Sequence, residues 1–147
     1  MEKKQYTYSY PRPAVTADCI ALSPEGGEMH VLLVQRKNEP FKGQWAFPGG
    51  FMNIDEDAAA AAHRELREET GVVAGQLMQL GAYTRVDRDP RDRIVSIAHV
   101  AYFDKRPEAV AGDDAAEARW FPVNELPPLA FDHAEMLRDV QDLINPT

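Results

Sequence analysis

Three glutamates near the middle of the chain stand at a spacing that would bring their carboxylates together. Glu65, Glu68 and Glu69 occupy positions i, i+3 and i+4, so all three would lie on one face of a helix. Three carboxylates at such close range do not all stay ionised unless a cation lies among them. Because the set offers hard oxygen ligands without histidine or cysteine, it favours Mg²⁺, with Mn²⁺ as the alternative, over zinc. Taken alone, the motif also fits a solvated acidic helix end.

The helix that would carry these glutamates is predicted over residues 54–70. Asn53 is the expected N-cap, and Glu56, three residues later, completes a capping box. The acidic residues around Glu56 would then lie in the first turn, where the helix dipole favours anions. The alanine run at 58–62 favours helix and leaves little bulk, so the helix can pack closely against its neighbours. Gly71 is expected to end the helix.

Apolar and β-branched runs on both sides of this helix predict strands. They would cover residues 14–22, 29–37, 45–47, 76–85, 93–104 and 118–123. The loops would cover 38–50, apart from its short strand, and 106–117. An amphipathic helix, with Asp132 as N-cap, is expected to close the chain over 132–144. Strands on both sides of a helix predict an α/β fold with a mixed sheet.

The composition is that of a compact globular domain without disulfides. The chain has 147 residues, 44% of them hydrophobic, and its one cysteine, Cys19, lies in an apolar run and is expected to be buried. The N-terminal segment lacks the apolar core of a signal peptide, and no run approaches the ~20 apolar residues that span a bilayer. We therefore expect a cytoplasmic protein with no membrane partner.

The charge balance bears on the class of ligand. The chain carries 16 basic and 24 acidic residues, a net charge of −8, which disfavours wholesale binding to nucleic-acid phosphates. An anionic small molecule could still bind through local arginines or a metal ion. We expect residues 1–13 to form an extended aromatic arm, a candidate dimer contact, and residues 14–147 to form a single domain.

The stretch around the three glutamates resembles a known family motif. It reads Gly50, five residues, Glu56, seven residues, and then RELREETGV from Arg64 to Val72. This resembles the Nudix box, G-x5-E-x7-R-E-U-x-E-E-x-G-U with U aliphatic, at every specified position. The order of predicted elements fits the fold that the resemblance implies, the Nudix α/β/α sandwich with a mixed β-sheet. The implied activity is hydrolysis of a nucleoside diphosphate linked to another group, by attack of water on phosphorus.

The resemblance also implies which residues would hold the metal. Glu65 and Glu69 would ligate a divalent ion, Mg²⁺ or Mn²⁺, together with the backbone carbonyl of Gly49. Glu68 would share a second ion or activate water. Two ions would neutralise the pyrophosphate and lower the pKa of a bound water, which gives a nucleophile near neutral pH.

A supporting ion pair and a general base complete the implied catalytic set. Arg64 would pair with Glu56 and hold the helix against the loop before it. In related enzymes an acid from a late loop often serves as the base. This sequence leaves the base open among Glu108, Asp113, Asp114 and Glu117.

Substrate binding is predicted from residues outside the box. The run RDPRDRIVSIAHVAYF resembles the RDPR-x4-S-x-A segment of a Nudix group that includes ADP-ribose pyrophosphatases and ADP-ribose-sensing transcription regulators, which assigns Arg88 and Arg91 to the substrate. Arg36 at a strand end is a candidate phosphate ligand, and it also fits a plain surface charge. The candidates for stacking on a base are Trp45, Phe47, Tyr83 and Tyr102, each of which also fits a core position. The leading expectation is cleavage of ADP-ribose to AMP and ribose 5-phosphate. On composition alone, the arginine-rich run also fits a self-neutralising surface turn.

Two other functions stay open. A house-cleaning nucleoside triphosphate pyrophosphohydrolase would release pyrophosphate, whereas a non-catalytic ADP-ribose or nucleotide sensor would bind without turnover. In the related regulators a winged-helix domain follows the Nudix domain, and the residues after ARWFP are too few for one, so DNA binding is not expected. The resemblance makes a homodimer the expected assembly.

Overall fold

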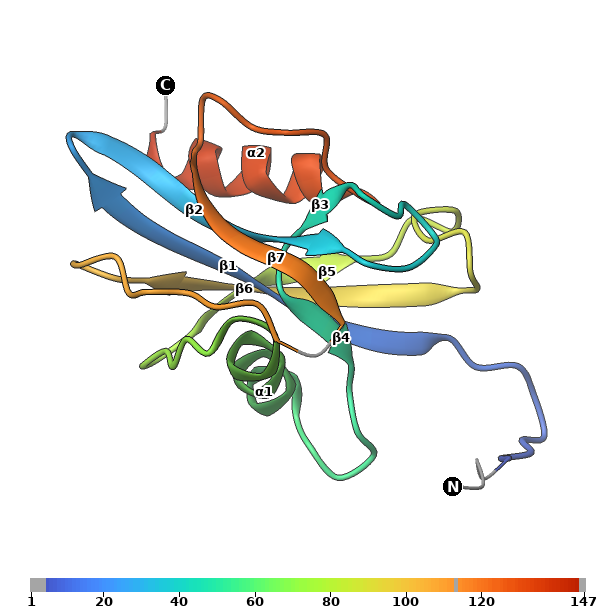
Figure 1. Ribbon diagram of the computed structural model, residues 1–147. Helices are drawn as coiled ribbons and strands as arrows, with labels where there is room; N and C mark the ends of the chain where they lie inside the picture. The colour runs from blue at the N-terminus through green and yellow to red at the C-terminus, as the bar shows by residue number, and fades with distance from the viewer. Residues whose placement is uncertain (1–4, 113, 146–147) are drawn as a thin grey trace.

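A computed structural model describes residues 5–112 and 114–145. In chain order its elements are β1 (Ala14–Glu25), β2 (Glu28–Arg36), β3 (Trp45–Ala46), β4 (Gly49–Phe51), α1 (Ala58–Thr70), β5 (Met78–Tyr83), β6 (Ile94–Tyr102), β7 (Ala115–Pro122) and α2 (His133–Ile144) (Figure 1). The α/β class predicted from the sequence is confirmed.

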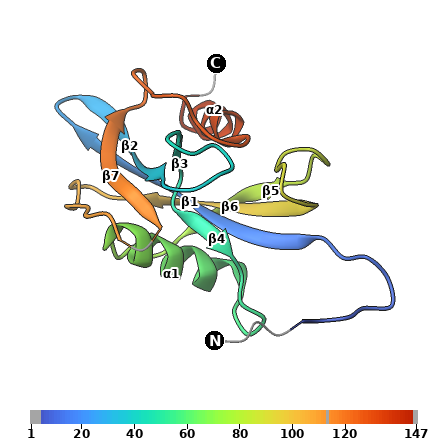
Figure 2. The same cartoon turned by 45° about the vertical axis from the view of Figure 1, so that its right-hand side comes forward.

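The strands form a mixed sheet with a helix on each face. Its main path is β3-β2-β1-β6-β5, with β4 beside β1 and β7 beside β2. β1 and β6 run parallel, with Ala14 opposite Ile94 and Leu22 opposite Tyr102, while the other pairings are antiparallel. α1 lies on one face and α2 on the other (Figures 1 and 2). The expected α/β/α sandwich is therefore present.

Side chains of β1 alternate between the two layers of core, as a strand buried on both faces requires. Small residues form the centre of the α1 layer: Ala17, Cys19, Ala21, Ala61 and Ala62. Larger ones form the α2 layer: Ile20, Leu22, Met136, Leu137 and Val140. The alanine run thus lets α1 approach the sheet closely, and Cys19 is buried as predicted.

β1 exchanges one antiparallel neighbour for another along its length. It pairs with β2 at Leu22 to Glu25 and with β4 at Thr16 to Asp18. Beyond the hairpin, β2 continues beside β7 and β3. The cavity that holds the candidate site is lined by the first half of β1, the end of β2 and β4, where these strands part.

α1 begins at Ala58 rather than at residue 54, so the predicted N-terminus is wrong. Asp57 is the N-cap, and its side chain accepts a backbone N–H from the first turn. The Asn53 N–H donates to Glu56 at 2.8 Å, so that half of the predicted capping box exists, but it closes a loop and not a helix turn. The reason is that Arg64 also binds the Glu56 carboxylate, which fixes it outside the helix.

Other element ends mostly follow the predicted ranges. Gly71 ends α1 with φ of 74°, as expected, and donates its N–H to the Arg67 carbonyl at 2.8 Å. β4 was expected to be loop, and it forms because its backbone pairs with β1. β7 begins at Ala115, inside the predicted loop 106–117, because Ala115 pairs with Arg36 of β2.

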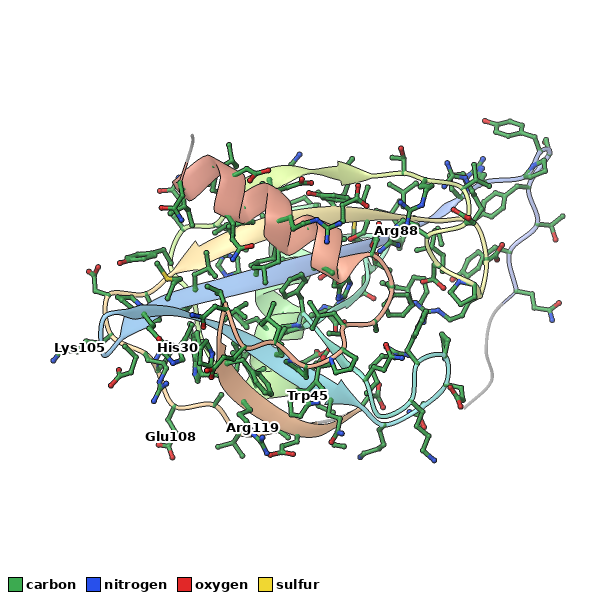
Figure 3. The ribbon with its side chains drawn as sticks, turned by 90° about the horizontal axis from the view of Figure 1, so that it is seen from above. His30, Trp45, Arg88, Lys105, Glu108 and Arg119 are labelled. Atoms are coloured by element: carbon green, nitrogen blue, oxygen red, sulfur yellow. The ribbon has the colours of Figure 1, made fainter. Side chains whose placement is uncertain are left out.

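α2 starts after Asp132, at the predicted N-cap, yet the Asp132 side chain makes no capping hydrogen bond. Its carboxylate instead receives two hydrogen bonds from the Arg88 guanidinium, at 2.9 and 2.7 Å. A buried arginine needs such a partner more than an N–H at a helix end does. This contact ties the loop between β5 and β6 to the start of α2, where Figure 3 shows Arg88.

The segment before β1 extends away from the sandwich (Figure 1). Residues 5–13 are exposed, with Tyr6 70% and Tyr10 65% accessible, and the Arg12 guanidinium lies 3.8 Å from the centre of the Tyr8 ring. The division into an arm and a single domain remains a prediction. Within the described residues no helix combines the length and hydropathy needed to cross a membrane.

Candidate active site

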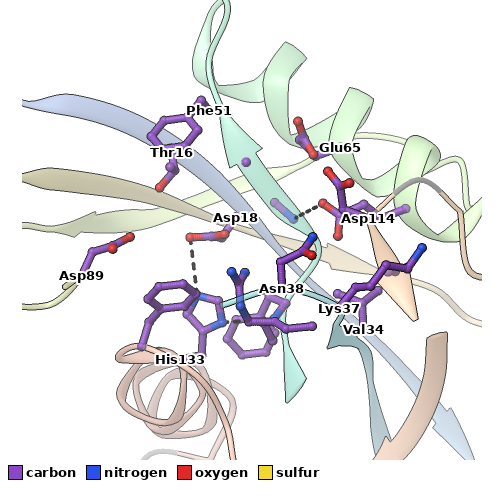
Figure 4. A pocket seen from close by; sticks show the side chains of 18 of the residues that line it. Thr16, Asp18, Val34, Lys37, Asn38, Phe51, Glu65, Asp89, Asp114 and His133 are labelled. Atoms are coloured by element: carbon purple, nitrogen blue, oxygen red, sulfur yellow. Dashed lines mark hydrogen bonds and ion pairs between the residues drawn. The ribbon is translucent and has the colours of Figure 1, made fainter. Parts of the chain in front are cut away.

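A cavity of about 450 Å³ gathers charged residues from segments far apart in the sequence (Figure 4). Asp18 comes from β1, Glu65 from α1 and His133 from the start of α2. The predicted site residues that line the cavity are Arg36, Phe47, Gly49, Arg64, Glu65, Glu69, Arg88 and Arg91. Glu56 and Glu68 stand behind this lining, in contact with Arg64.

Two glycines of β4 allow α1 and β1 to come close to each other. A Cβ on Gly50 would lie 2.7 Å from the Cδ of Glu65, and a Cβ on Gly49 would overlap the Asp18 carboxylate. Real Cβ atoms do not tolerate such contacts, so both positions need glycine. The close approach places the backbone of β4 directly against the carboxylates of α1.

Arg64 is the centre of a network that joins α1 to the loop before it. Its guanidinium binds Glu56 at 2.6 Å, Glu65 at 2.7 Å and Glu68 at 3.2 Å, and also donates to the Phe51 carbonyl at 3.0 Å. The expected Glu56–Arg64 ion pair is thus present. Hydrogen bonding from Arg64 lowers the pKa of Glu56, and the Glu56 contact in turn raises the pKa of Arg64.

Glu69 is a buried acid whose surroundings disfavour its charged form. Burial, a hydrogen bond with Glu65 and the negative charge of Glu65 raise the pKa of Glu69 to about 9. Its Oε1 accepts a hydrogen bond from the Gly49 N–H at 3.3 Å, which opposes the shift. Without a cation, Glu69 therefore holds a proton at neutral pH.

The donors around Glu69 fit a divalent cation. The carboxylates of Glu65 and Glu69 offer oxygen ligands only, which suits Mg²⁺ or Mn²⁺, while Gly49 presents its backbone N–H to Glu69. A cation would relieve the repulsion that now keeps Glu69 protonated. Among the residues that the structure describes, no three His, Cys, Asp or Glu side chains already stand together as a metal site. Arg64 accounts for this, because it draws Glu65 and Glu68 towards itself.

Asp18 is a second buried acid in the cavity, and its pKa is shifted in the opposite direction to that of Glu69. Burial alone would raise its pKa, but contacts with His133 and Ser96 and the charge of Arg88 outweigh burial and lower it. The Ser96 hydroxyl donates to Asp18, and the His133 Nε2 lies 3.7 Å from its Oδ2 (Figure 4). Asp18 is therefore a fixed negative charge beside Gly49.

Two neighbouring arginines also line the cavity. The guanidinium carbons of Arg36 and Arg91 lie 4.9 and 5.4 Å from the centre of the Phe131 ring, and that of Arg91 lies 5.2 Å from the Phe51 ring. Asp89 holds Arg91 in place at 2.7 Å. Burial and the charge of Arg91 lower the pKa of Arg36. Two like charges kept this close make a receptor for an anion.

Arg88 and Phe47 reach the cavity, but their main contacts are with protein. The Arg88 and Asp132 side chains are each 2% exposed and ion-paired. Burial disfavours the charge on Arg88, but Asp132 outweighs burial and raises the pKa of Arg88. Phe47 belongs to the α2 layer of the core and stacks on His133, with ring centres 4.9 Å apart. Both residues thus have visible structural contacts, and their predicted substrate roles remain predictions.

The candidate bases lie in different surroundings. Asp114 lines the cavity, whereas Glu117 pairs with Arg119. Glu108 is exposed. Asp113 lies outside the described residues. The structure therefore favours Asp114 among the candidates that it describes.

Sequence reasoning missed several residues of the cavity, among them Asp18, Phe131 and His133. Asp18 did carry a signal, since it is a lone charge inside the apolar run AVTADCIAL. His133 follows the predicted N-cap of the last helix, but nothing local indicates its distant partners. Phe131 has no such signal, because only the fold brings its ring between Arg36 and Arg91.

Comparisons with known proteins agree with this geometry. The model of the NUDIX domain matches residues 12–140. The chain is 43% identical over 130 residues to the ADP-ribose pyrophosphatase of Methanocaldococcus jannaschii, a match that covers 88% of this chain and 74% of that protein.

The names of two further relatives mention ADP-ribose, one as a signal to which it responds and one as its bound ligand. The ADPR responsive transcriptional repressor NtrR of Acinetobacter baylyi is 33% identical over 146 residues, which cover 96% of this chain and 58% of the repressor. The NUDIX domain of Shewanella oneidensis NrtR, solved in complex with ADP ribose, superposes with a TM-score of 0.87 at 28% identity, covering 93% of this chain and 92% of that one.

Proposed function

The chain belongs to the Nudix family of hydrolases, and on this premise we propose that it is a Mg²⁺-dependent pyrophosphohydrolase that cleaves ADP-ribose to AMP and ribose 5-phosphate. Mn²⁺ is expected to replace Mg²⁺, because the donor set consists of hard oxygen atoms. The substrate is taken from the relatives named for ADP-ribose.

The observation that carries the proposal is that one cavity is lined both by acids and by a pair of neighbouring arginines. We call Glu65, Glu69 and Asp18 the acidic wall and Arg36 and Arg91 the arginine wall. A pyrophosphate bridged to the acidic wall by divalent cations would present its remaining oxygens to the arginines. A neutral or cationic substrate would do nothing to offset the repulsion between the two arginines.

The acidic wall would hold the metal and prepare the nucleophile. Glu65, Glu69 and the Gly49 carbonyl would be ligands, and Glu68 would leave Arg64 to share a second ion or to orient water. When bound, the metal supplies charge neutralisation and a lowered pKa for a coordinated water. Asp114 would accept a proton from that water. Attack on one phosphorus would break its bond to the bridging oxygen and leave each product with a phosphomonoester.

The arginine wall, Arg36 and Arg91, would orient the substrate for in-line attack. Arg36 and Arg91 would each donate planar pairs of hydrogen bonds to phosphate oxygens, which fixes the diphosphate more sharply than a point charge does. The exposed ring of Phe51 beside Arg91 would pack against the organic part of the substrate.

A sensor without turnover is the second candidate, because one relative is named as an ADPR responsive repressor. It requires the same arginine wall but no metal-activated water. The two functions therefore predict the same affinity for ADP-ribose and differ in turnover.

Product chromatography separates these functions. Purified protein would be incubated with Mg²⁺ and, separately, with ADP-ribose, other nucleoside diphosphate sugars and nucleoside triphosphates. We expect AMP and ribose 5-phosphate from ADP-ribose, and loss of about 100-fold or more of the rate in Glu69→Gln. Glu25→Gln makes the same chemical change at an exposed hairpin position and should retain the rate. Binding without products would establish the sensor, and pyrophosphate from a triphosphate would replace the proposed substrate.

A further inference from the structure

His133, the first residue of α2, makes a backbone contact that bears on the candidate metal site. Its ring is 3% exposed, and its Nδ1 accepts a hydrogen bond from the Phe47 N–H at 3.1 Å across 86 positions of sequence. The ring also stacks on Phe47, with 23° between the two planes. The contact joins the start of α2 to the connector Phe47–Gly49, which links β3 to β4.

Each residue of this connector is hydrogen-bonded to a different layer. The Phe47 N–H donates to His133, and the Pro48 carbonyl accepts from the Cys19 N–H of β1 at 2.8 Å. The Gly49 N–H donates to Glu69 of α1 at 3.3 Å. The direction of the Gly49 peptide therefore depends on contacts with α2, β1 and α1 together, and His133 supplies the one from α2.

The far side of the His133 ring faces Asp18. Because Nδ1 accepts, the neutral ring carries its proton on Nε2, which points towards Asp18 at 3.7 Å. Asp18 in turn accepts from Ser96, and the neighbouring Asp132 binds Arg88. A buried ring that is hydrogen-bonded to the Phe47 N–H and stacked on the Phe47 ring can set the position of the backbone that it contacts.

We propose that His133 is a positioning residue for the hydrolytic reaction. By accepting from Phe47, it orients the connector so that the Gly49 carbonyl meets the metal and Glu69 stays against the Gly49 N–H. The effect on metal affinity rests on the proposed metal site, and the effect on turnover rests on the proposed reaction as well. A residue with this role affects turnover and metal affinity more than substrate affinity, because its hydrogen bond is to the connector.

The alternative role for His133 is to fill core volume under Phe47. The two roles predict different outcomes for a pair of substitutions. In His133→Asn the side-chain amide oxygen can take the place of Nδ1 and accept from Phe47. In His133→Leu the side chain fills the site but accepts nothing, so the Phe47 N–H is left buried and unpaired.

The test measures kcat and KM for ADP-ribose, Mn²⁺ affinity by electron paramagnetic resonance, and the thermal midpoint of each variant. We expect His133→Leu to lower kcat by about 10- to 100-fold and to weaken Mn²⁺ binding about 10-fold, with KM changed by less than about 3-fold. His133→Asn should stay within about 3-fold of the unmodified protein in both kcat and Mn²⁺ affinity.

Asp139→Ala is the matched control for general loosening of α2. Asp139 accepts a hydrogen bond from the Tyr83 hydroxyl at 2.6 Å, so its loss removes another sheet contact of the same helix without touching the connector. We expect it to lower the thermal midpoint and leave kcat and Mn²⁺ affinity unchanged.

The proposal is overturned if His133→Asn loses as much kcat and Mn²⁺ affinity as His133→Leu, because volume or ring stacking would then explain both. It is also overturned if folded His133→Leu matches the unmodified protein, or if its defect lies in KM alone. If no variant, including the unmodified protein, turns over ADP-ribose, the proposed substrate fails. The Mn²⁺ affinities of the Asn and Leu variants then decide the positioning role.

Discussion

Glu69 and Asp18 show how neighbouring surroundings give two buried acids opposite charge states. Glu69 lies against Glu65, so burial and like charge raise its pKa to about 9. Asp18 has His133, Ser96 and the charge of Arg88 around it, so its pKa is lowered despite burial. The surroundings of Asp18 favour its anion, whereas those of Glu69 favour its protonated form. In the proposed mechanism, a bound cation would bring Glu69 to the charge that a metal ligand requires.

The first prediction concerns the stability of the metal-free protein against pH. The ordinary pKa of Glu69 is 4.5 and the folded value is about 9, so between these values the folded state holds a proton that the unfolded chain has lost. The contribution of Glu69 to the free energy of unfolding should therefore be largest below about pH 4.5 and should fall as the pH rises to about 9.

Urea denaturation at several pH values, with a chelator present, measures this dependence. Glu69→Gln should have a flatter profile than the unmodified protein, because an amide cannot titrate. If the unmodified protein instead gained stability relative to Glu69→Gln as the pH rose, the raised pKa of Glu69 would be contradicted. Addition of Mn²⁺ near pH 7 should release a proton from the unmodified protein and not from Glu69→Gln.

The second prediction concerns the arginine wall. Arg91→Gln removes a cation that lies between Phe51 and Phe131, so KM for ADP-ribose should rise about 10-fold or more, since a charge-assisted hydrogen bond is worth about 1.5 kcal/mol or more. Arg119→Gln is the control, because Arg119 also lies over aromatic rings but outside the cavity. An unchanged KM in Arg91→Gln would remove this residue from the substrate site.

Among the elements, α1 and β4 form the most closely packed pair at the site. Alanines of α1 meet the small residues of β1, and Gly50 of β4 meets Glu65. The helical face that carries the three glutamates follows from spacing alone, as does the end at Gly71. The start at Ala58 does not follow from spacing. The ion pair between Glu56 and Arg64 keeps residues 54–57 out of the helix, and these two residues are too far apart in sequence to meet along one helix.

The third prediction tests this packing. In Gly50→Ala the new methyl group would lie 2.7 Å from the Glu65 carboxyl carbon, so β4 or α1 must shift. We expect a loss of about 1–3 kcal/mol in the free energy of unfolding, together with a lower kcat, because the shift moves a metal ligand. Gly75→Ala is the control, since a Cβ there meets nothing within 4 Å and should change neither quantity.

Across the molecule, the sheet and its two helical layers could be predicted from the sequence, but the composition of the cavity could be predicted only in part. Strands and helices follow from apolar runs, and the acidic wall from one short motif. The arginine wall depends on contacts of Phe131 with Arg36 and Arg91, and these three residues come from three separate segments. Asp18 and His133 likewise meet only because β1 runs beneath the start of α2. Long-range partners of this kind leave no local pattern.

The fourth prediction concerns the N-terminal arm. Tyr6 and Tyr10 are largely exposed, and an arm this aromatic is expected to be covered by a second copy of the chain. Light scattering coupled to gel filtration should therefore give a dimer for the full chain and a monomer after removal of residues 1–13. A full-length monomer at micromolar concentration would contradict the homodimer.

The decisive test of the proposed metal-dependent hydrolysis is the product balance from ADP-ribose as Mg²⁺ is titrated. The acidic wall and the arginine wall together predict AMP and ribose 5-phosphate in equal amounts, at a rate that rises from zero with Mg²⁺ and is nearly lost in Glu69→Gln. Turnover that persists in excess chelator, or that is unaffected in Glu69→Gln, would contradict a mechanism built on the glutamates of α1.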